Sequence, residues 1–224
     1  MFESTLEKEN TINKISIKKL TYLFIKRLFD ILISIIGLLL LIPITIFVKL
    51  AYICTGDFTS IFFVQGRIGK NGKEFKLYKY RSMVKDADEV LFRTLELDKI
   101  MAEEYNKNKK LKNDPRVTKM GRVIRKLSID ELPQFINVFL GDMSLIGNRP
   151  YLPREKKDMG NYYEDIIKTK PGLTGYWQVN GRSETTFEER LKLEKEYSEK
   201  ASALLDIKIF FKTFTVVLFG KGAE

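Results

Sequence analysis

Histidine is absent from this chain of 224 residues, and cysteine occurs once, as Cys54. The absence of an imidazole excludes Ser-His-Asp hydrolysis, histidine acid–base catalysis and every histidine-ligated metal site. A single thiol excludes an intrachain disulfide and a cysteine zinc cluster, and it is typical of a protein with reducing, cytosolic chemistry. Any catalysis must therefore use carboxylates, amines, hydroxyls or backbone groups.

The common phosphate-binding loops are missing as well. The sequence has neither Gly-x-x-x-x-Gly-Lys-Ser/Thr nor Gly-x-Gly-x-x-Gly. Asp86-Ala87-Asp88 has the spacing of the Asp-x-Asp metal site of Rossmann-like glycosyltransferases, but the strand–helix units that frame such a site are missing. A pair of acids on a solvated helix is the better interpretation.

Basic residues outnumber acidic ones by 39 to 29, which gives a net charge of +10. A basic chain is expected to bind something anionic, such as nucleic acid, lipid headgroups or a phosphorylated substrate. The basic stretch at residues 107–126 lacks a recognisable nucleic-acid-binding motif. This favours a surface that faces solvent or lipid headgroups.

One apolar segment predicts insertion into a membrane. A polar N-terminal segment covers residues 1–21, and an uncharged run of 18 residues covers 31–48. As a helix this run reaches roughly 27 Å, close to the thickness of the hydrocarbon core of a bilayer. The polar leader is too long for a signal peptide. We expect a membrane helix at about residues 28–50, and a buried helix of a soluble protein is the alternative.

Pro43 lies inside this run and predicts a break in the helix. Proline removes a backbone N–H and frees a carbonyl one turn earlier, and the hydroxyls of Ser34 and Thr45 can bond to backbone groups nearby. Lysine and arginine flank both ends of the run, so both flanks are expected to stay in the cytoplasm. A re-entrant helix that bends at Pro43 and returns to the same face satisfies both flanks; a single span is the alternative.

A β-hairpin is expected after the apolar run. Residues 60–68 are rich in aromatic and β-branched side chains, residues 74–83 alternate apolar and basic ones, and Asn71-Gly72 lies between them. Helical patterns follow at residues 84–112 and 132–140, from Thr185 with a capping box to Glu188, and at 203–219. The apolar positions of the last helix fit either a core face or a helix that lies on a bilayer.

The strongest candidate for chemistry is the acid pair Asp130-Glu131, which follows Arg125. Ser128 and Glu131 have capping-box spacing, so the acids fit the start of a helix. Pro133 would lie too deep in a helix capped by Ser128, however, and it favours a start near Asp130. A helix start of this kind would keep the carboxylates ionised and attract phosphate. On these residues alone, catalysis and capping both remain open.

Several ordered motifs together resemble one family, the bacterial sugar transferases, which are monotopic polyprenyl-phosphate phosphoglycosyl transferases. The resemblance covers roughly residues 22–220. The motifs are Phe63-Val64-Gln65 with Arg67 and Gly69, Lys79-Tyr80-Arg81-Ser82-Met83, Asp114-Pro115-Arg116-Val117-Thr118, residues 125–134, residues 141–150, Lys170-Pro171-Gly172-Leu173-Thr174-Gly175 and residues 177–182.

This resemblance implies a fold, a cellular location and an activity. The fold is an α/β, predominantly helical monotopic membrane domain over residues 22–224, with a re-entrant helix, a small β-hairpin and interfacial amphipathic helices. The expected location of the protein is the cytoplasmic face of the bacterial inner membrane. The activity is transfer of a sugar 1-phosphate from a UDP-sugar to polyprenyl (undecaprenyl) phosphate with release of UMP, as the first membrane step of glycoconjugate or exopolysaccharide assembly.

The resemblance also implies site residues and a cofactor. Asp130 aligns with the family's nucleophile, which forms a covalent phosphosugar–aspartyl intermediate, and Glu131 aligns with its partner. Both are candidate ligands of Mg²⁺, which prefers oxygen. The candidates for binding the substrate and its phosphates are Arg125, Arg149, Arg182 and Gln178.

The physical chemistry of these residues fits such roles. A carboxylate is ionised at neutral pH and needs no histidine to act as a nucleophile. Its difficulty is the approach to an anionic diphosphate, which Mg²⁺ and arginines ease by neutralising charge. The expected partners are therefore a UDP-sugar, polyprenyl phosphate and membrane lipid, and not nucleic acid.

Three departures from the family pattern are visible. Ile42 precedes Pro43 where the family often has serine, and Asn148 replaces the first proline of Gly-Pro-Arg-Pro. Trp177 stands where many members that use N-acetylated sugars have alanine, which favours a hexose such as galactose or glucose. A membrane-anchored basic protein that binds anionic lipid or nucleic acid, with the two acids as helix caps, is the alternative function.

Overall fold

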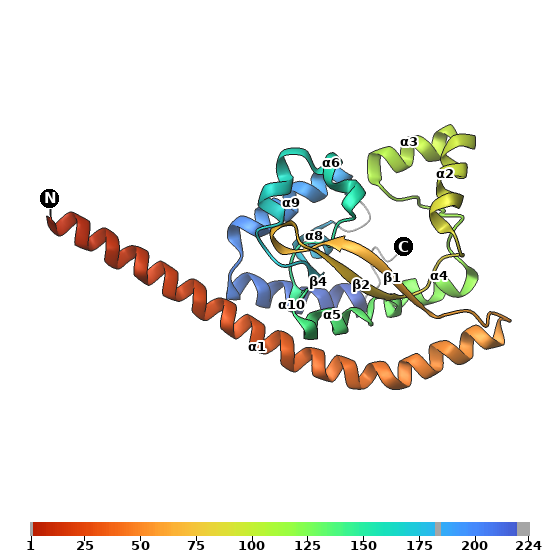
Figure 1. Ribbon diagram of the computed structural model, residues 1–224, viewed down its shortest axis with the longest axis horizontal. Coiled ribbons are helices and arrows are strands. Elements are labelled where there is room, and N and C mark those ends of the chain that lie inside the picture. Colours follow the sequence, from red (N-terminus) through yellow and green to blue (C-terminus); the bar gives the residue numbers. More distant parts are fainter. Residues whose placement is uncertain (1, 182–184, 219–224) are drawn as a thin grey trace.

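The computed structural model describes residues 2–181 and 185–218 and is mostly helical, as predicted. Its first element, α1, is a single helix over Phe2–Cys54. The N-terminal part of α1 projects away from the rest of the molecule, whereas its C-terminal half runs beneath the other elements (Figure 1).

The apolar part of α1 is largely uncovered by the protein. Ile17–Cys54 is long and apolar enough to cross a membrane, judged by length and composition, and 22% of its most apolar window is buried. Phe24, Leu39 and Phe47 are among its exposed side chains. A core helix of a soluble domain would bury most of such a window, so that alternative is not supported.

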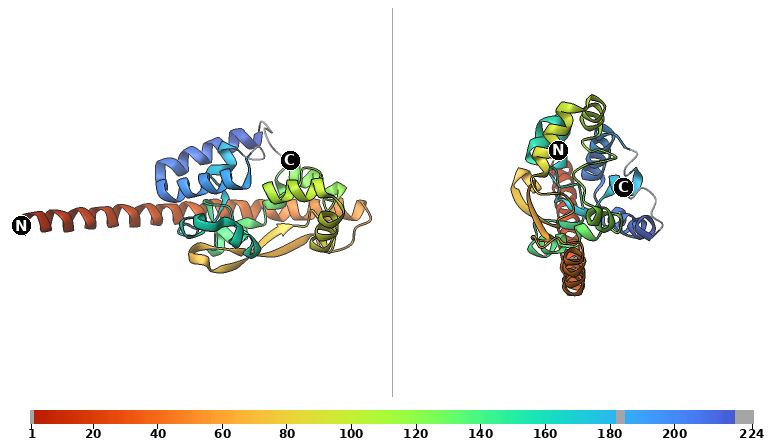
Figure 2. Two further views of the ribbon diagram at one scale, coloured as in Figure 1. Left: turned by 90° about the horizontal axis from the view of Figure 1, so that it is seen from above. Right: turned by 90° about the vertical axis from the view of Figure 1, so that its right-hand side faces the viewer.

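α1 stays helical through Pro43 but is not straight. In Figure 1, both halves of α1 slope from a bend toward the other elements. In the view from above in Figure 2, the axis of α1 is nearly straight. As expected, nearby hydroxyls bond to the backbone: Ser34 Oγ donates to the Ile31 carbonyl at 2.9 Å, and Thr45 Oγ1 to the Leu41 carbonyl at 2.7 Å. Re-entry into one face of a bilayer stays a prediction.

The predicted hairpin is confirmed. Strands β1 (Phe62–Ile68) and β2 (Glu74–Tyr80) pair antiparallel. The turn between them is the 3-10 segment η1 (Lys70–Gly72), in which Asn71 has φ 58° and Gly72 has φ 77°. Asparagine and glycine tolerate this left-handed region better than other residues, which explains why this dipeptide turns the chain.

A second, parallel pair of strands was not predicted from the sequence. β3 (Ser144–Ile146) pairs with β4 (Gly172–Thr174). Gly147, just after β3, allows the close approach, because a Cβ there would lie 2.3 Å from the backbone oxygen of Lys170. This contact fixes the segment that follows, which includes Arg149.

The predicted helix over residues 84–112 is wrong, since two helices occupy this region. α2 covers Ala87–Leu97 and α3 covers Lys99–Asn108. Asp98 separates them with an extended backbone, and its carboxylate accepts hydrogen bonds from the N–H groups at the start of α3. An aspartate at this position stabilises a new helix start more than it stabilises a continuing helix.

The helix expected from Thr185 starts one residue later than predicted. α9 covers Phe187–Lys200, and its capping box joins Thr186 to Glu189. Both threonines are followed by a glutamate at the right spacing, so the capping pattern alone does not choose between them. The observed register buries Phe187 and Leu191 in the core.

The remaining elements are short apart from the last helix. The helix at Gln134–Leu140 agrees with the one expected at 132–140, and the last helix, Ala203–Leu218, agrees with the one expected at 203–219. The remaining elements are α4 (Lys119–Lys126), η2 (Ile129–Glu131), α5 (Gln134–Leu140), η3 (Pro153–Glu155), α6 (Lys156–Met159), η4 (Gly160–Tyr162), α7 (Tyr163–Ile166), α8 (Tyr176–Asn180) and α10 (Ala203–Leu218).

Polar contacts join α1 to the rest of the protein. Lys26 Nζ donates to the Asp206 carboxylate of α10 at 2.5 Å. The buried carboxylate of Asp30 accepts from Ser144 Oγ and from the Leu145 N–H of β3. α1 is thus fixed to the strands and to α10 by polar contacts. Some of its apolar side chains, such as Val48 and Tyr52, are buried in the core, while many others remain exposed.

α10 combines the two alternatives left open by its sequence. Ile209 is buried in the main core, whereas Leu204, Ile207, Phe211 and Phe214 are exposed. Figure 1 shows α10 on the same side of the molecule as α5 and α1. One face of the helix therefore belongs to the core, and the other is an uncovered apolar face.

Candidate active site

The acid pair lies in η2, the short turn between α4 and α5. The capping box from Ser128 to Glu131 is not formed, because Ser128 has a left-handed backbone with φ 56° and its side chain caps nothing. α5 begins only after Pro133, which has no side-chain cap either. The two acids are therefore not explained by helix capping.

The two carboxyl groups differ in their surroundings. Asp130 is 7% exposed, and burial raises its pKa to about 6 despite the opposing effect of Lys79. Burial would also raise the pKa of Glu131, but the cations Lys79, Arg149 and Arg67 outweigh it and lower that pKa. Neighbouring acids whose pKa values move apart are typical of sites that use them for different tasks.

Lys79 of β2 forms an ion pair with Glu131, the second acid of the pair. Its Nζ donates to Glu131 Oε1 at 2.9 Å, and both side chains are partly exposed. β2 thus places a cation beside η2, although 52 positions separate the two residues in the chain.

A cationic cleft of about 330 Å³, open mouth included, brings together several predicted residues. Glu131, Arg149 and Gln178 all line it, as do two cations that had no predicted role, Arg67 and Lys79. Both additional cations lie in the family-like motifs of the sequence, but nothing local indicated that they face Glu131. Such a cleft, with three cations around one carboxylate, suits a diphosphate group.

Arg67 is held rigidly at the cleft. It is 7% exposed, its Nη1 donates to the Pro150 carbonyl at 2.9 Å, and its Nη2 donates to Gln65 Oε1 at 2.7 Å. Burial lowers its pKa to about 10, so it remains cationic at neutral pH. A guanidinium fixed in this way presents its charge without losing side-chain entropy on binding.

The other predicted residues are placed differently. Arg125 does not line the cleft; its Nε donates to Ser82 Oγ at 2.9 Å, and its charge opposes the rise in the pKa of Asp130. Pro43 belongs to α1 and is distant in sequence from the acids. Arg182 lies outside the described residues.

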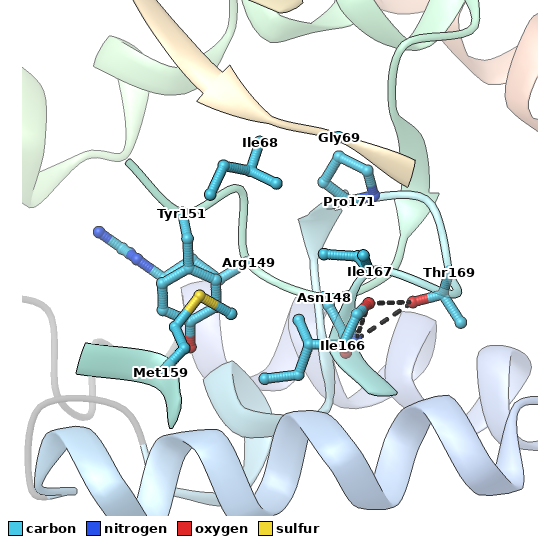
Figure 3. Close-up of a pocket in the computed structure, with 10 residues that line it drawn as sticks. All are labelled: Ile68, Gly69, Asn148, Arg149, Tyr151, Met159, Ile166, Ile167, Thr169 and Pro171. Atoms are coloured by element: carbon cyan, nitrogen blue, oxygen red, sulfur yellow. Dashed lines mark hydrogen bonds between the residues drawn. The ribbon is translucent and has the colours of Figure 1, made fainter. Parts of the chain in front are cut away.

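A second, smaller and mostly apolar cavity shares Arg149 with the cleft (Figure 3). There Asn148 Nδ2 donates to the Ile166 carbonyl and to Thr169 Oγ1, both at 3.1 Å. The side chain of Arg149 extends away from Asn148 in this view (Figure 3). Asn148 thus fixes the turn after β3, which compensates for the proline that the family often has there.

The acid pair is also the best candidate for a metal site. Among the residues that the structure describes, no three acidic or sulfur side chains converge. Two adjacent carboxylates nevertheless fit Mg²⁺, which commonly takes one or two carboxylates and completes its shell with water and substrate phosphates. Asp130 and Glu131 are the residues that would hold it.

Comparison with protein families gives a match to bacterial sugar transferases over residues 21–220. The chain belongs to the bacterial sugar transferase family. This membership confirms the resemblance seen in the motifs, and it covers the acid pair, the cleft and the apolar part of α1.

Individual relatives have names that agree with this family. The chain is 44% identical over 203 residues to an undecaprenyl-phosphate galactose phosphotransferase of Salmonella typhimurium, covering 89% of this chain and 42% of that protein. It is 39% identical over 198 residues to exopolysaccharide production protein ExoY of Sinorhizobium fredii, covering 88% and 87%. It is 36% identical over 211 residues to a UDP-N-acetylgalactosamine-undecaprenyl-phosphate N-acetylgalactosaminephosphotransferase of Aeromonas hydrophila, covering 91% and 46%.

The lengths of these relatives differ. This chain spans less than half the length of the Salmonella and Aeromonas proteins but most of the length of ExoY. The matched region is therefore a unit that occurs in both longer and shorter proteins of the family.

Proposed function

We propose that this sugar transferase moves a sugar 1-phosphate from a UDP-sugar to polyprenyl phosphate, in keeping with undecaprenyl-phosphate relatives. The observation that carries the proposal is the acid pair beside a cleft lined by Arg67, Lys79 and Arg149. The cations suit a diphosphate, and the carboxylates supply a nucleophile where the chain has no histidine. UDP-galactose and UDP-glucose are the first candidates for the donor.

In the proposed reaction, a carboxylate oxygen of Asp130 attacks the phosphorus that carries the sugar. The bond from this phosphorus to the bridging oxygen breaks, and UMP leaves with the bond's electron pair. A phosphate oxygen of polyprenyl phosphate then attacks the same phosphorus, which restores the Asp130 carboxylate and forms the polyprenyl diphosphate sugar. Two displacements at one phosphorus conserve every atom of both substrates.

The surroundings of the acids suit these steps. With a pKa of about 6, Asp130 is largely ionised at neutral pH, and its burial removes water that would weaken its attack. Lys79 and Arg149 favour the ionised form of Glu131. The same two cations would neutralise phosphate oxygens as UMP leaves. Mg²⁺ bound by the acid pair would supply further neutralisation of the diphosphate.

We also propose that α1 enters the cytoplasmic face of a bacterial inner membrane and returns to it. The bend in α1, with both halves sloping toward the other elements, supports this course (Figure 1). The exposed apolar face of α10 lies on the same side and would rest on the leaflet. The phosphate of a lipid-linked acceptor would then lie at the height of the headgroups, where the basic protein attracts anionic lipid.

The test is UMP release by the purified protein in nanodiscs with undecaprenyl phosphate, Mg²⁺ and a panel of UDP-sugars. We expect release with at least one sugar, none after Asp130→Asn, and loss on chelation of the metal that added Mg²⁺ reverses. Glu103→Gln, an exposed acid of α3, is the matched control and should remain active. Full activity of Asp130→Asn would contradict the assigned nucleophile. A protein that binds anionic lipid but releases no UMP would favour the alternative function.

A further inference from the structure

We infer that α9 positions Arg149 in the cleft, through the carboxylate of Glu194 on the Arg149 backbone and through a stack of Arg190, Trp177 and Arg149. This inference rests on the proposed function, in which Arg149 binds substrate phosphate. Arg190, Glu194 and Trp177 do not line the cleft. They are therefore positioning residues.

The first contact is between Glu194 and the backbone. The Arg149 N–H donates to both carboxylate oxygens of Glu194, at 3.0 and 2.9 Å, and Glu194 is 1% exposed. Burying a carboxylate is costly unless hydrogen bonds and nearby cations compensate. Here Arg149 and Arg190 both attract it. The carboxylate thus fixes the point at which the Arg149 side chain leaves the backbone.

The second contact is the aromatic stack. The guanidinium carbon of Arg190 lies 4.5 Å from the centre of the Trp177 ring, and that of Arg149 lies 5.8 Å from the same ring. Arg190 is 4% exposed and Trp177 is 8% exposed. A guanidinium is attracted to an indole face, more strongly where water is excluded. The indole ring of Trp177 therefore restrains the side chain of Arg149, while Glu194 holds the Arg149 backbone.

The charges explain why the two contacts occur together. Arg149 and Arg190 repel each other, and this repulsion adds to burial in lowering the pKa of Arg190. Glu194 lies one helical turn after Arg190 on α9, so both side chains project from the same face of the helix. The carboxylate of Glu194 offsets the repulsion between the two cations, with a smaller contribution from Glu155, and loss of Glu194 would push them apart.

α9 is well suited to fix this geometry. The capping box at Thr186 and Glu189 sets the register of the helix, and Leu191 and Tyr197 anchor it in the core. A capped helix with one face packed in the core does not easily shift by a fraction of a turn. Arg190 and Glu194 therefore hold fixed positions relative to the turn after β3.

One consequence concerns the role of Trp177. Its ring is buried against arginines and does not line the cleft, so it influences the donor through Arg149 and not by contact with the sugar. Phenylalanine at this position should raise the KM of every UDP-sugar by a similar factor. A change confined to one sugar would overturn this point.

The direct test uses fluorescence, because Trp177 is the single tryptophan of the chain. Arg190→Lys keeps the charge but loses the planar guanidinium, and Glu194→Gln keeps one acceptor oxygen but loses the charge. We expect both variants, and Arg149→Gln, to change the emission of Trp177 in the folded protein. Lys192→Gln, on the exposed side of α9, should leave the emission unchanged. Unchanged emission in Arg190→Lys and Glu194→Gln would overturn the inference, whether or not the protein turns over UDP-sugars.

A double-mutant cycle tests the link to Arg149. Arg190→Lys and Glu194→Gln should each raise the KM for the UDP-sugar about tenfold or more, with a smaller effect on kcat. In an Arg149→Gln background the same changes should add little, because the side chain that they position is gone. Additive losses, or a fall in thermal stability that accounts for the loss of activity, would contradict a positioning role. Wild-type protein that releases no UMP would refute the proposed function and leave the fluorescence result standing.

Discussion

The ammonium group of Lys79 donates to Glu131 across 2.9 Å and joins strand β2 to the turn that carries the acid pair. This ion pair lowers the pKa of Glu131, whereas burial raises that of Asp130 to about 6. The charge of Lys79 lowers the pKa of both carboxyl groups, but only Glu131 also accepts its hydrogen bond, and at Asp130 burial outweighs the cation. The hairpin is therefore part of the site as well as part of the scaffold.

Replacement of Lys79 by methionine should reduce UMP release roughly a hundredfold, the usual loss when one charge-stabilising donor is removed. The pKa of Glu131 should rise in this variant, because its ion-pair partner is gone. Lys76→Met changes an exposed lysine of the same strand and serves as the control. Equal activity of the two variants would show that the ion pair has no part in the reaction.

Gly147→Ala should destabilise the protein by about 1–3 kcal/mol, the usual cost of overpacking. The added Cβ would lie 2.3 Å from the Lys170 oxygen and 2.8 Å from the Gly172 nitrogen, so the strand pair must separate. Thermal unfolding in detergent measures the effect. Gly66→Ala in β1 is the control, since its Cβ would meet nothing within 4 Å. Similar melting temperatures for both variants would contradict the close approach.

Asp206→Ala should weaken the attachment of α1 to the rest of the protein. Lys26, Tyr22 and Tyr197 all donate to the Asp206 carboxylate. Removing one partner of a buried ion pair typically costs roughly 3–5 kcal/mol, because the other charge stays buried. Unfolding by denaturant in micelles measures this loss. Glu89→Ala, which breaks the exposed pair with Arg93, should cost less than about 1 kcal/mol.

The re-entrant course of α1 predicts that both of its ends face the cytoplasm. Cys54, at the end of α1, is exposed and is the single cysteine of the chain. It should react with a membrane-impermeant maleimide in inside-out vesicles and not in spheroplasts. Ser4→Cys in a Cys54→Ser background reports on the other end and should behave in the same way.

Labelling of the two ends from opposite sides of the membrane would refute re-entry. Pro43→Leu provides a further comparison, because it restores the backbone N–H that the proline removes within α1. We expect this change to move part of the population to a spanning orientation. An unchanged labelling pattern would show that Pro43 does not decide the topology.

Much of the secondary structure was accessible from the sequence because its signals are local. The hairpin follows from Asn71-Gly72 between two strand-like runs, and the apolar helix follows from its composition. The same local reasoning failed at Asp98, where one capping side chain divides a predicted helix. It also placed the start of α9 one residue early, because the choice between two possible caps depends on which apolar residues reach the core.

The sequence by itself determined the chemical options of this protein: no histidine, one cysteine, an adjacent pair of acids, a basic surface and a membrane-seeking helix. Only the tertiary structure decided which cations meet which acids. Lys79 reaches Glu131 across 52 positions, and Glu194 reaches the Arg149 backbone across 45. Turn and helix signals act over a few residues, whereas such contacts depend on how whole elements pack, and this packing buries Asp130 and opens the cleft beside it.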